Sequence, residues 1–411
     1  MSNSVEVLFP SNRRESITDI VKRVSASKAS QKFLSDDMVA FIAAFSRAIF
    51  RDKSFRTHPE LISLASWCRS KRIEGLIQEY SKVDRTLYLR EKGVAFHIAP
   101  SNVDTIFVYS LFISLLAGNK NIIKVSSRNS EVIIQIIKVF FEVVAREPHF
   151  NFIKDYITVI QYENQNEITD IISFTADLRV IWGGDESILN IRKSPLRPTA
   201  SEVAFPNRFS FSILDSSSYL ELIEDDKSQL VDKFVADAST FGQQACSSPR
   251  LLFWLGSAIE TKSACEDFSS RIQSISLTDD FFDMTERLVS ITNFVARNEC
   301  EVTGLRASFC NLKAPLNKEM IQSLRECHTG NNWLLHVSAS SVTDLNEYLT
   351  HKDQTASYFG LSREDISNFL DSIEGRAIDR VVPIGSALNF DHVWDGHDLL
   401  MSFSRQVRVQ R

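Results

Sequence analysis

One cysteine of this 411-residue chain has the surroundings of a reactive thiol. Cys246 lies in a polar segment, 241–249 (FGQQACSSP), between a helix expected at 228–240 and a very apolar strand expected at 250–255. A thiolate nucleophile needs exposure and a polar or electropositive setting, and loops held by rigid elements often supply both. The alternative is a half-buried loop cysteine without a chemical role, which is a common use of a free cysteine.

The region from residue 93 to residue 182 alternates short apolar strands with helices. The strands are expected at 93–98, 121–125, 156–161 and 179–182, and the helices at about 105–117, 131–145 and 167–174. Gly118 and Asn119 form a helix stop signal, and Ser130 is a helix N-cap. This alternation indicates a parallel α/β sheet of the nucleotide-binding kind, with right-handed crossovers.

The chain is long enough for more than one domain. Residues 1–90 have mostly helical patterns, so residues 1–226 are expected to form a helical N-terminus and a nucleotide-binding domain, with a further strand at 209–214 and a polar, acidic boundary at 216–226. A second α/β domain is expected at 227–390 and contains Cys246. Residues 391–411 are expected to return to the first domain or to form a subunit contact.

The overall charge and the cysteine spacing exclude several classes of protein. The 46 basic and 52 acidic side chains are well mixed, with a net charge of −6, which argues against a general nucleic-acid-binding protein. Residues 1–13 lack the apolar core of a signal peptide, and the apolar run 106–117 is too short to span a bilayer, so a cytoplasmic protein without a membrane span is expected. The six cysteines have no CxxC spacing, so no structural metal site is expected.

Several segments together resemble a known family. The segment FGQQACSSPR, followed by LLFW, resembles the nucleophile loop of the LuxC-type acyl-CoA reductases, which belong to the aldehyde dehydrogenase superfamily. Further blocks occur in the order that this family requires: GVAFHIAPSNVD (93–104), LLAGNKNIIKVSSRNS (115–130), VIWGGDESI (180–188), RFSFSIL (208–214) and RVVPIGSALNFDHVWDGHDLL (380–400). The resemblance covers about residues 88–405 and implies an aldehyde dehydrogenase-like α/β fold, with a Rossmann-type NADP-binding domain and an α/β catalytic domain.

The resemblance implies catalytic roles for two residues. Cys246 would be the nucleophile that carries the acyl group. The side chain of Asn102, in the turn Pro100-Ser101-Asn102, and the backbone N–H of Cys246 would donate hydrogen bonds to the oxyanion. An asparagine that only closes its own turn is the alternative for Asn102.

The resemblance also implies a site for NADPH. Lys124 would reach the adenine-side ribose or its phosphate, next to Ser126, Ser127 and Arg128. This loop has no carboxylate to accept a ribose hydroxyl, which favours NADPH over NADH, although Arg128 also suits a solvated strand end. Gly183 and Gly184 would let the backbone approach the cofactor pyrophosphate, but a two-glycine turn follows many strands.

The expected reaction is the NADPH-dependent reduction of an acyl-CoA or acyl-protein thioester to an aldehyde. The stretch 204–207 lacks the glutamate that activates water in hydrolytic relatives, and the general acid is unidentified, with His97 either a candidate or a core residue. The alternatives are the reverse reaction, which makes acyl-CoA, and a binding protein without activity. Some relatives have an acyl-protein synthetase as partner. We expect a homo-oligomer, of a size that the sequence leaves open, as it does the acyl chain.

Overall fold

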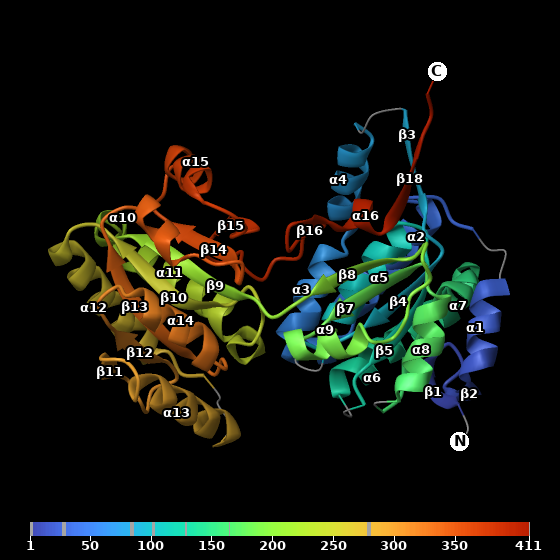
Figure 1. The fold of residues 1–411 in the computed structure, drawn as a ribbon, viewed down its shortest axis with the longest axis horizontal. Helices are drawn as coiled ribbons and strands as arrows, with labels where there is room; N and C mark the ends of the chain where they lie inside the picture. The colour runs from blue at the N-terminus through green and yellow to red at the C-terminus, as the bar shows by residue number, and fades with distance from the viewer. Residues whose placement is uncertain are drawn as a thin grey trace. The chain divides into compact units, whose positions relative to one another are not determined.

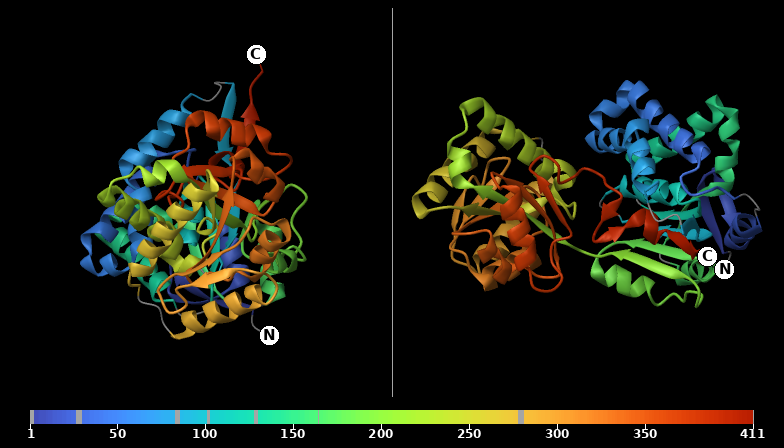
Figure 2. Two further views of the ribbon diagram at one scale, coloured as in Figure 1. Left: turned by 90° about the vertical axis from the view of Figure 1, so that its left-hand side faces the viewer. Right: turned by 90° about the horizontal axis from the view of Figure 1, so that it is seen from above.

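The computed structural model describes residues 3–26, 30–82, 86–100, 103–127, 130–163, 165–277 and 281–410. It divides into two compact units, Met1–Asn207 with Phe390–Arg411, and Arg208–Asn389 (Figures 1 and 2). In the described part of the chain, no helix combines the length and the apolar character needed to cross a membrane.

Unit 1 is built on a seven-stranded sheet in the order β2-β1-β6-β5-β4-β7-β8. Five of its strands are parallel: β4 (Val94–Ile98), β5 (Lys120–Val125), β6 (Ile157–Gln161), β7 (Leu178–Trp182) and β8 (Ser201–Phe205). The first of these, β4, is central, with β5 and β6 on one side and β7 and β8 on the other. This is a dinucleotide-binding strand order, in which ligands bind beyond the carboxyl ends of the strands next to the central one.

Helices cover both faces of this sheet. On one face, α1 (Ile17–Ala26), α8 (Asn166–Thr175) and α9 (Asp185–Ile191) pack against β4 through aliphatic side chains. On the other face lie α5 (Ile106–Leu116), which is buried along its whole length, and α6 (Glu131–Arg146), whose N-cap Ser130 accepts a hydrogen bond from Ile133. Phenylalanine rings join α5 and α6 to α2 (Asp36–Arg51). The remaining helices of unit 1 are η1 (Lys53–Thr57), α3 (Pro59–Trp67), α4 (Ser70–Tyr80), η2 (Pro148–Phe152), α7 (Ile153–Tyr156) and α16 (Leu399–Ser402).

The expectation that residues 1–90 are mostly helical fits α1, α2, α3 and α4, whereas residues 4–9, 13–16 and 87–90 form strands. Strand β1 (Ser4–Phe9) pairs antiparallel with β6 and with β2 (Arg13–Ser16), and so extends the sheet. Val5, Val7 and Phe9 are buried while Glu6 is exposed. This alternation with a period of two is the signal of a half-buried strand that the sequence contained.

Unit 2 has a second seven-stranded sheet, in the order β11-β12-β13-β10-β9-β14-β15. All neighbouring pairs are parallel except β11 with β12. The strands are β9 (Phe209–Asp215), β10 (Pro249–Leu255), β11 (Glu301–Thr303), β12 (Cys310–Lys313), β13 (Trp333–Ala339), β14 (Asp353–Phe359) and β15 (Arg380–Pro383).

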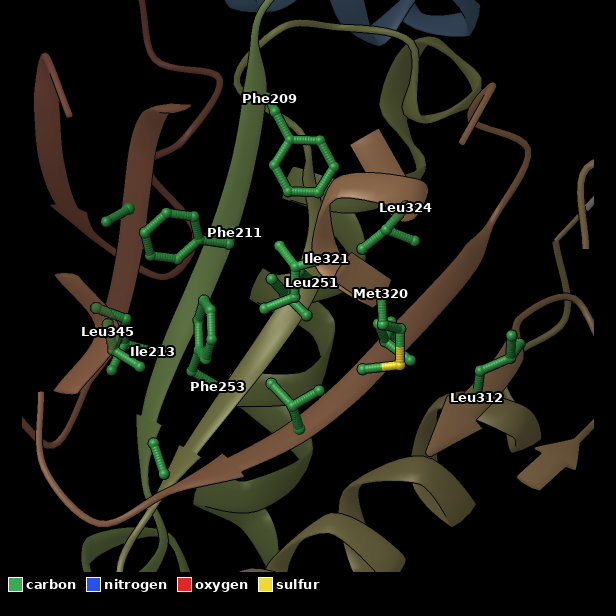
Figure 3. Packing of buried hydrophobic residues seen from close by; sticks show 14 of the residues in the cluster. Phe209, Phe211, Ile213, Leu251, Phe253, Leu312, Met320, Ile321, Leu324 and Leu345 are labelled. Carbon is green, nitrogen blue, oxygen red and sulfur yellow. The ribbon is translucent and has the colours of Figure 1, made fainter. Parts of the chain in front are cut away.

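Alternate residues of these strands point to opposite faces of the sheet. Phe209, Phe211 and Ile213 of β9 face one core, in which the rings of Phe211 and Phe253 meet edge to face at 5.2 Å (Figure 3). That core is covered by α13 (Phe281–Val295), α14 (Lys318–Cys327), η4 (Thr343–Tyr348) and α15 (Arg363–Ser372). The opposite face is covered by α10 (Ser216–Leu220), α11 (Glu224–Ser239) and α12 (Ala258–Ser274).

The boundary between the units lies after Asn207, earlier than the expected boundary at 226. The reason is that β9 forms the centre of the second sheet, between β10 and β14, so the strand expected at 209–214 belongs to unit 2. The C-terminal segment returns to unit 1, where β18 (Ser404–Arg408) pairs with β3 (Leu87–Glu91) and the short strands β16 (Val393–Trp394) and β17 (His397–Asp398) pair with each other.

Candidate active site

The segment before Cys246 has an unusual backbone. The short helix η3 (Thr240–Gln243) follows α11, and Phe241, Gly242 and Gln243 all adopt left-handed conformations, with φ between 58° and 60°. Non-glycine residues rarely adopt this conformation, so surrounding contacts must hold it. Asn331, just before β13, supplies one such contact by donating its N–H to the carbonyl of Gly242 at 2.7 Å.

Gln243 holds the turn against the amino-terminal edge of the sheet. Its fully buried side chain donates to the carbonyls of Pro249 at 2.9 Å and Trp333 at 3.1 Å. Its Oε1 atom accepts the backbone N–H of Trp333 at 3.1 Å. The side chain therefore supplies hydrogen bonds to backbone groups at the first residues of β10 and β13.

Cys246 lies half-buried in the loop between η3 and β10. The hydroxyl of Ser210, on β9, donates to the carbonyl of Cys246 at 2.6 Å and accepts the N–H of Thr355, on β14, at 3.2 Å. Two strands of the sheet thus fix the backbone at the thiol, which is the kind of rigid support that a nucleophile needs.

Arg250, in β10, places a buried positive charge near this thiol. It is only 8% exposed, lies 6.0 Å from the centre of the Phe209 ring and donates weakly to the carbonyl of Gln243 at 3.4 Å. No carboxylate among the described residues forms an ion pair with it. Burial lowers the pKa of Arg250 to about 10, and negative charge on Cys246 acts in the opposite direction. The same attraction stabilises a thiolate at Cys246.

The other cysteines have more ordinary environments. All six are free, and Cys68, Cys265 and Cys310 are buried. Burial raises the pKa of the thiols of Cys68, Cys265 and Cys300, and that of Cys310 to about 12. These four thiols are poorly suited to nucleophilic chemistry.

His328 lies at the same edge of the sheet but is held in its neutral form. Its Nδ1 accepts the N–H of Gly330 at 3.1 Å, so its Nε2 donates to the carbonyl of Trp333 at 2.8 Å. Burial and the charge of Arg250 lower the pKa of His328 well below its usual value. His328 therefore shapes the loop before β13, and nothing in its geometry marks it as a general acid.

The described cofactor residues expected in unit 1 lie at or just after the carboxyl ends of β5 and β7. Lys124 is near the end of β5, with its Nζ 4.9 Å from the centre of the Tyr162 ring, and burial lowers its pKa. No ion pair to Lys124 occurs in the described part of the chain. Ser126 is half-buried and its carbonyl accepts the side chain of Gln161 at 2.6 Å, while Ser127 is exposed. A half-buried ammonium group without a carboxylate partner fits an anionic ligand.

Gly183 and Gly184 form the turn between β7 and α9. A side chain at Gly184 would meet no atom within 4 Å, so the backbone is approachable there. The first turn of α9 contains Asp185 and Glu186, whose charges oppose a bound phosphate. The turn fits close approach of a ligand better than it fits an additional negative charge.

Two expected site residues, Asn102 and Arg128, lie outside the described residues. The sequence reasoning also missed two residues, Gln243 and Arg250. Gln243 gave no signal beyond a polar loop. A signal for Arg250 did exist, because an arginine at the head of a very apolar strand is costly to bury without a purpose.

His97 is a core residue rather than an exposed acid. It is buried on β4, with Nε2 3.0 Å from Oδ1 of Asn121 and Nδ1 2.8 Å from the hydroxyl of Ser110. The amide of Asn121 donates to two backbone carbonyls, so its Oδ1 accepts from His97 and the ring is neutral. Burial lowers the pKa of His97 to about 4. Within the described ranges, no group of three or more His, Cys, Asp or Glu side chains could hold a metal ion.

Comparison with solved structures defines the fold. A crystal structure of a NAD-dependent benzaldehyde dehydrogenase from Corynebacterium glutamicum matches the whole of this chain and 99% of its own, with a TM-score of 0.66 and 13% identity. The crystal structure of PnpE from Pseudomonas sp. WBC-3 matches 96% of this chain, with a TM-score of 0.68 and 13% identity. The chain has the aldehyde dehydrogenase fold, with two α/β units that are each built on a mostly parallel sheet.

Sequence comparison defines the family. The family model described as acyl-CoA reductase (LuxC) matches residues 16–278, so the chain belongs to this family. The long-chain acyl-protein thioester reductase 2 of Photobacterium leiognathi is 23% identical over 325 residues, and the long-chain acyl-protein thioester reductase of Vibrio harveyi is 23% identical over 328 residues. Both alignments cover 77% of this chain and 63% of the relative, so the chain spans less than two thirds of the curated relatives it matches.

Proposed function

We propose that this protein reduces an acyl thioester to an aldehyde, with Cys246 as the nucleophile and NADPH as the hydride donor. The observation that carries the proposal is the half-buried Cys246 on a loop that Ser210 and Gln243 hold, with the buried guanidinium of Arg250 bonded to the same loop, in a member of the acyl-CoA reductase family. A thiolate held in such a setting is the form that attacks a carbonyl carbon.

The proposed acylation begins with the thiolate of Cys246. The sulfur of Cys246 bonds to the carbonyl carbon, and the carbonyl oxygen takes up the negative charge. The bond from that carbon to the carrier sulfur then breaks, and the carrier leaves as a thiol after taking a proton. The backbone N–H of Cys246 and the side chain of Asn102 are the proposed donors to the oxyanion, a role that is worth about 3 kcal/mol per donor.

The proposed cofactor residues are Lys124, Ser126, Ser127, Arg128, Gly183 and Gly184. Lys124 fits a ribose or phosphate because its ammonium group is half-buried without an ion-pair partner in the described ranges. When bound there, NADPH would supply a hydride to the acyl carbon, and cleavage of the carbon–sulfur bond would release the aldehyde and return the Cys246 thiolate. The glutamate of β8, Glu202, is not available as a base, because it pairs with Arg179 at 2.5 Å and with Arg192 at 2.8 Å.

The carrier and the partners are also part of the proposal. The named relatives act on long-chain acyl-protein thioesters, which supports either an acyl-CoA or an acyl-protein as substrate. An acyl-protein synthetase is the corresponding proposed partner, and a homo-oligomer is the proposed assembly. The residues permit both reaction directions, because the same thioester chemistry runs toward acyl-CoA when the concentrations of aldehyde and oxidised cofactor are high.

Mass spectrometry after incubation with a panel of acyl-CoAs tests the nucleophile. We expect an acyl adduct on Cys246 that disappears when NADPH is added and is absent in Cys246→Ala. Cys327→Ala is the matched control, because Cys327 is also half-buried and free. An adduct that persists in Cys246→Ala would contradict the assignment, and the absence of any adduct would favour a binding protein.

Titration of both cofactors tests the second half of the proposal. NADPH is expected to bind at least about tenfold tighter than NADH, which corresponds to about 1.4 kcal/mol. Lys124→Ala should weaken both cofactors, and Arg128→Ala should weaken NADPH selectively. Lys138→Ala, on the exposed face of α6, is the control for charge alone. Equal dissociation constants for NADPH and NADH would contradict the cofactor assignment and leave that of Cys246 intact.

A further inference from the structure

A pocket in unit 1 has no role in the proposed reaction. It has a volume of about 540 Å³ and lies where the end of α2 meets the junction of α3 and α4. Three arginines, one aromatic ring and two serines line it: Arg47, Arg51, Arg69, Phe50, Ser46 and Ser70. Its volume lies within the range of small-molecule sites, which is about 300–1,000 Å³.

The pocket lies in a strongly basic part of an acidic protein. Between residues 47 and 72, seven basic residues are opposed by two acidic ones, a net charge of +5 in a chain of net charge −6. None of the lining residues is acidic. The summed positive charge of such a cluster attracts anions.

The arginines of the pocket have weak or no ion pairs of their own. Within the described residues, Arg51 and Arg69 have no carboxylate partner, and Arg47 approaches Glu147 only at 3.8 Å. Both members of that pair are exposed, so the interaction contributes little to stability and leaves Arg47 able to bind another anion.

The aromatic ring orients one of these arginines. The guanidinium carbon of Arg69 lies 4.5 Å from the centre of the Phe50 ring, and Phe50 is 38% exposed. A guanidinium group held on a ring keeps its N–H groups directed outward in one plane, which suits the paired oxygens of a phosphate. Because the Phe50 ring is also partly exposed, a planar base can contact it.

Arg69 also precedes the first turn of α4, which adds to the positive field. Lys71 and Arg72 follow in this turn, where acidic residues are usual, and the turn contains none. The side chain of Arg69 does not cap the helix, and Arg72 forms an ion pair with Asp391 at 3.3 Å. Arg69 and Lys71 therefore remain to attract an anion.

We propose that this pocket binds the phosphate group of a nucleotide-like ligand. Arg47, Arg51 and Arg69 bind the phosphate, and Phe50 contacts the base. An acidic protein surface is the less favoured occupant, because the three arginines line one pocket of small-molecule volume that also contains a preformed guanidinium–ring pair. The proposal does not depend on the reaction at Cys246, because it is tested by binding alone.

Calorimetric titration of the full chain with adenosine 3′,5′-bisphosphate tests the proposal. The titration is made in a Lys124→Ala background, so that binding at the proposed cofactor site is weakened. We expect saturable binding that Arg51→Ala and Arg69→Ala each weaken at least about tenfold, since a charge-assisted hydrogen bond contributes about 1.5–3 kcal/mol. Phe50→Leu should weaken the bisphosphate and leave inorganic phosphate unchanged.

Arg56→Ala is the matched control. Arg56 is an exposed arginine of the same basic segment, in η1, and does not line the pocket. Its replacement should change the dissociation constant less than about twofold, since a screened surface charge contributes little. Separate titrations with CoA and NADPH identify which nucleotide source is preferred.

Three results would overturn the proposal. The first is the absence of saturable binding of the bisphosphate. The second is an equal loss of affinity in Arg56→Ala and Arg51→Ala, which would indicate a general field. The third is binding of a polyglutamate peptide that depends on Arg51 and Arg69 while the bisphosphate does not bind, which would identify a docking surface for an acidic protein.

Discussion

Replacing Gln243 with alanine should release the loop that contains Cys246. The change removes two hydrogen bonds to carbonyls and one from the N–H of Trp333. The carbonyl of Trp333 keeps its hydrogen bond from His328, at 2.8 Å. The N–H of Trp333 and the carbonyl of Pro249 lose the hydrogen bonds that the Gln243 side chain makes to them. Each buried group left unpaired costs about 1–3 kcal/mol, so the expected loss is about 2–6 kcal/mol.

Hydrogen–deuterium exchange of peptides covering residues 240–255 and 328–335 measures this loss locally. A local method is needed because a chain of two units need not unfold in one step. Faster exchange in Gln243→Ala should be accompanied by slower acylation of Cys246, because the left-handed turn that precedes the thiol is no longer held.

Gln244→Ala is the matched control for this prediction. Gln244 is the same residue type at the next position, is half-buried, and makes no side-chain hydrogen bond to the described residues. Its replacement should cost less than about 1 kcal/mol. Equal exchange and equal acylation rates in the two variants would refute the reasoning that Gln243 positions the loop.

Two further predictions concern charge. Arg250→Met should slow alkylation of Cys246 by iodoacetamide at pH 7 at least about tenfold, whereas Arg250→Lys should preserve most of the rate, because the cation stabilises the thiolate. The alkylation rate at Cys327 serves as the internal reference. An unchanged rate at Cys246 in Arg250→Met would exclude the electrostatic role of Arg250. His97 has a pKa of about 4 in the folded protein, below the ordinary value of 6.5. As the pH falls, the His97 ring therefore takes up a proton in the unfolded chain before it does so in the folded protein. The stability contributed by neutral His97 is lost as the pH falls from 6.5 to 4. Hydrogen–deuterium exchange of peptides covering β4 and β5 at several pH values should show the stability difference between the native protein and His97→Gln narrowing by about 3 kcal/mol over this interval. A constant difference would mean that the ring is not held neutral.

The local elements of the nucleotide-binding unit could be predicted from the sequence because their signals are local. Short apolar strands, the helix stop at Gly118 and the N-cap at Ser130 predict β4, α5, β5 and α6 to within one or two residues. The ordered motifs likewise predicted the family, which the comparison confirms. The roles of Cys246, Lys124 and the other proposed site residues remain predictions.

Long-range pairing was decided only by the tertiary structure. Nothing near residue 209 in the sequence indicates that β9 joins a sheet whose next strand begins at Pro249, so the boundary between the units could not be read from a local change in composition. The pairing of the C-terminal strand β18 with β3 is similar, because the two strands are far apart in the sequence and only the tertiary structure brings their edges together.

The environment of Cys246 shows the same division. The sequence by itself determined that a thiol lies in a polar loop before an apolar strand. Only the tertiary structure decided that Gln243 connects that loop to β13, that Ser210 holds the Cys246 carbonyl, and that Arg250 is buried without a carboxylate partner among the described residues. The physical reason is that hydrogen bonds and charge interactions depend on distance in space, and the partners come from strands far apart along the chain.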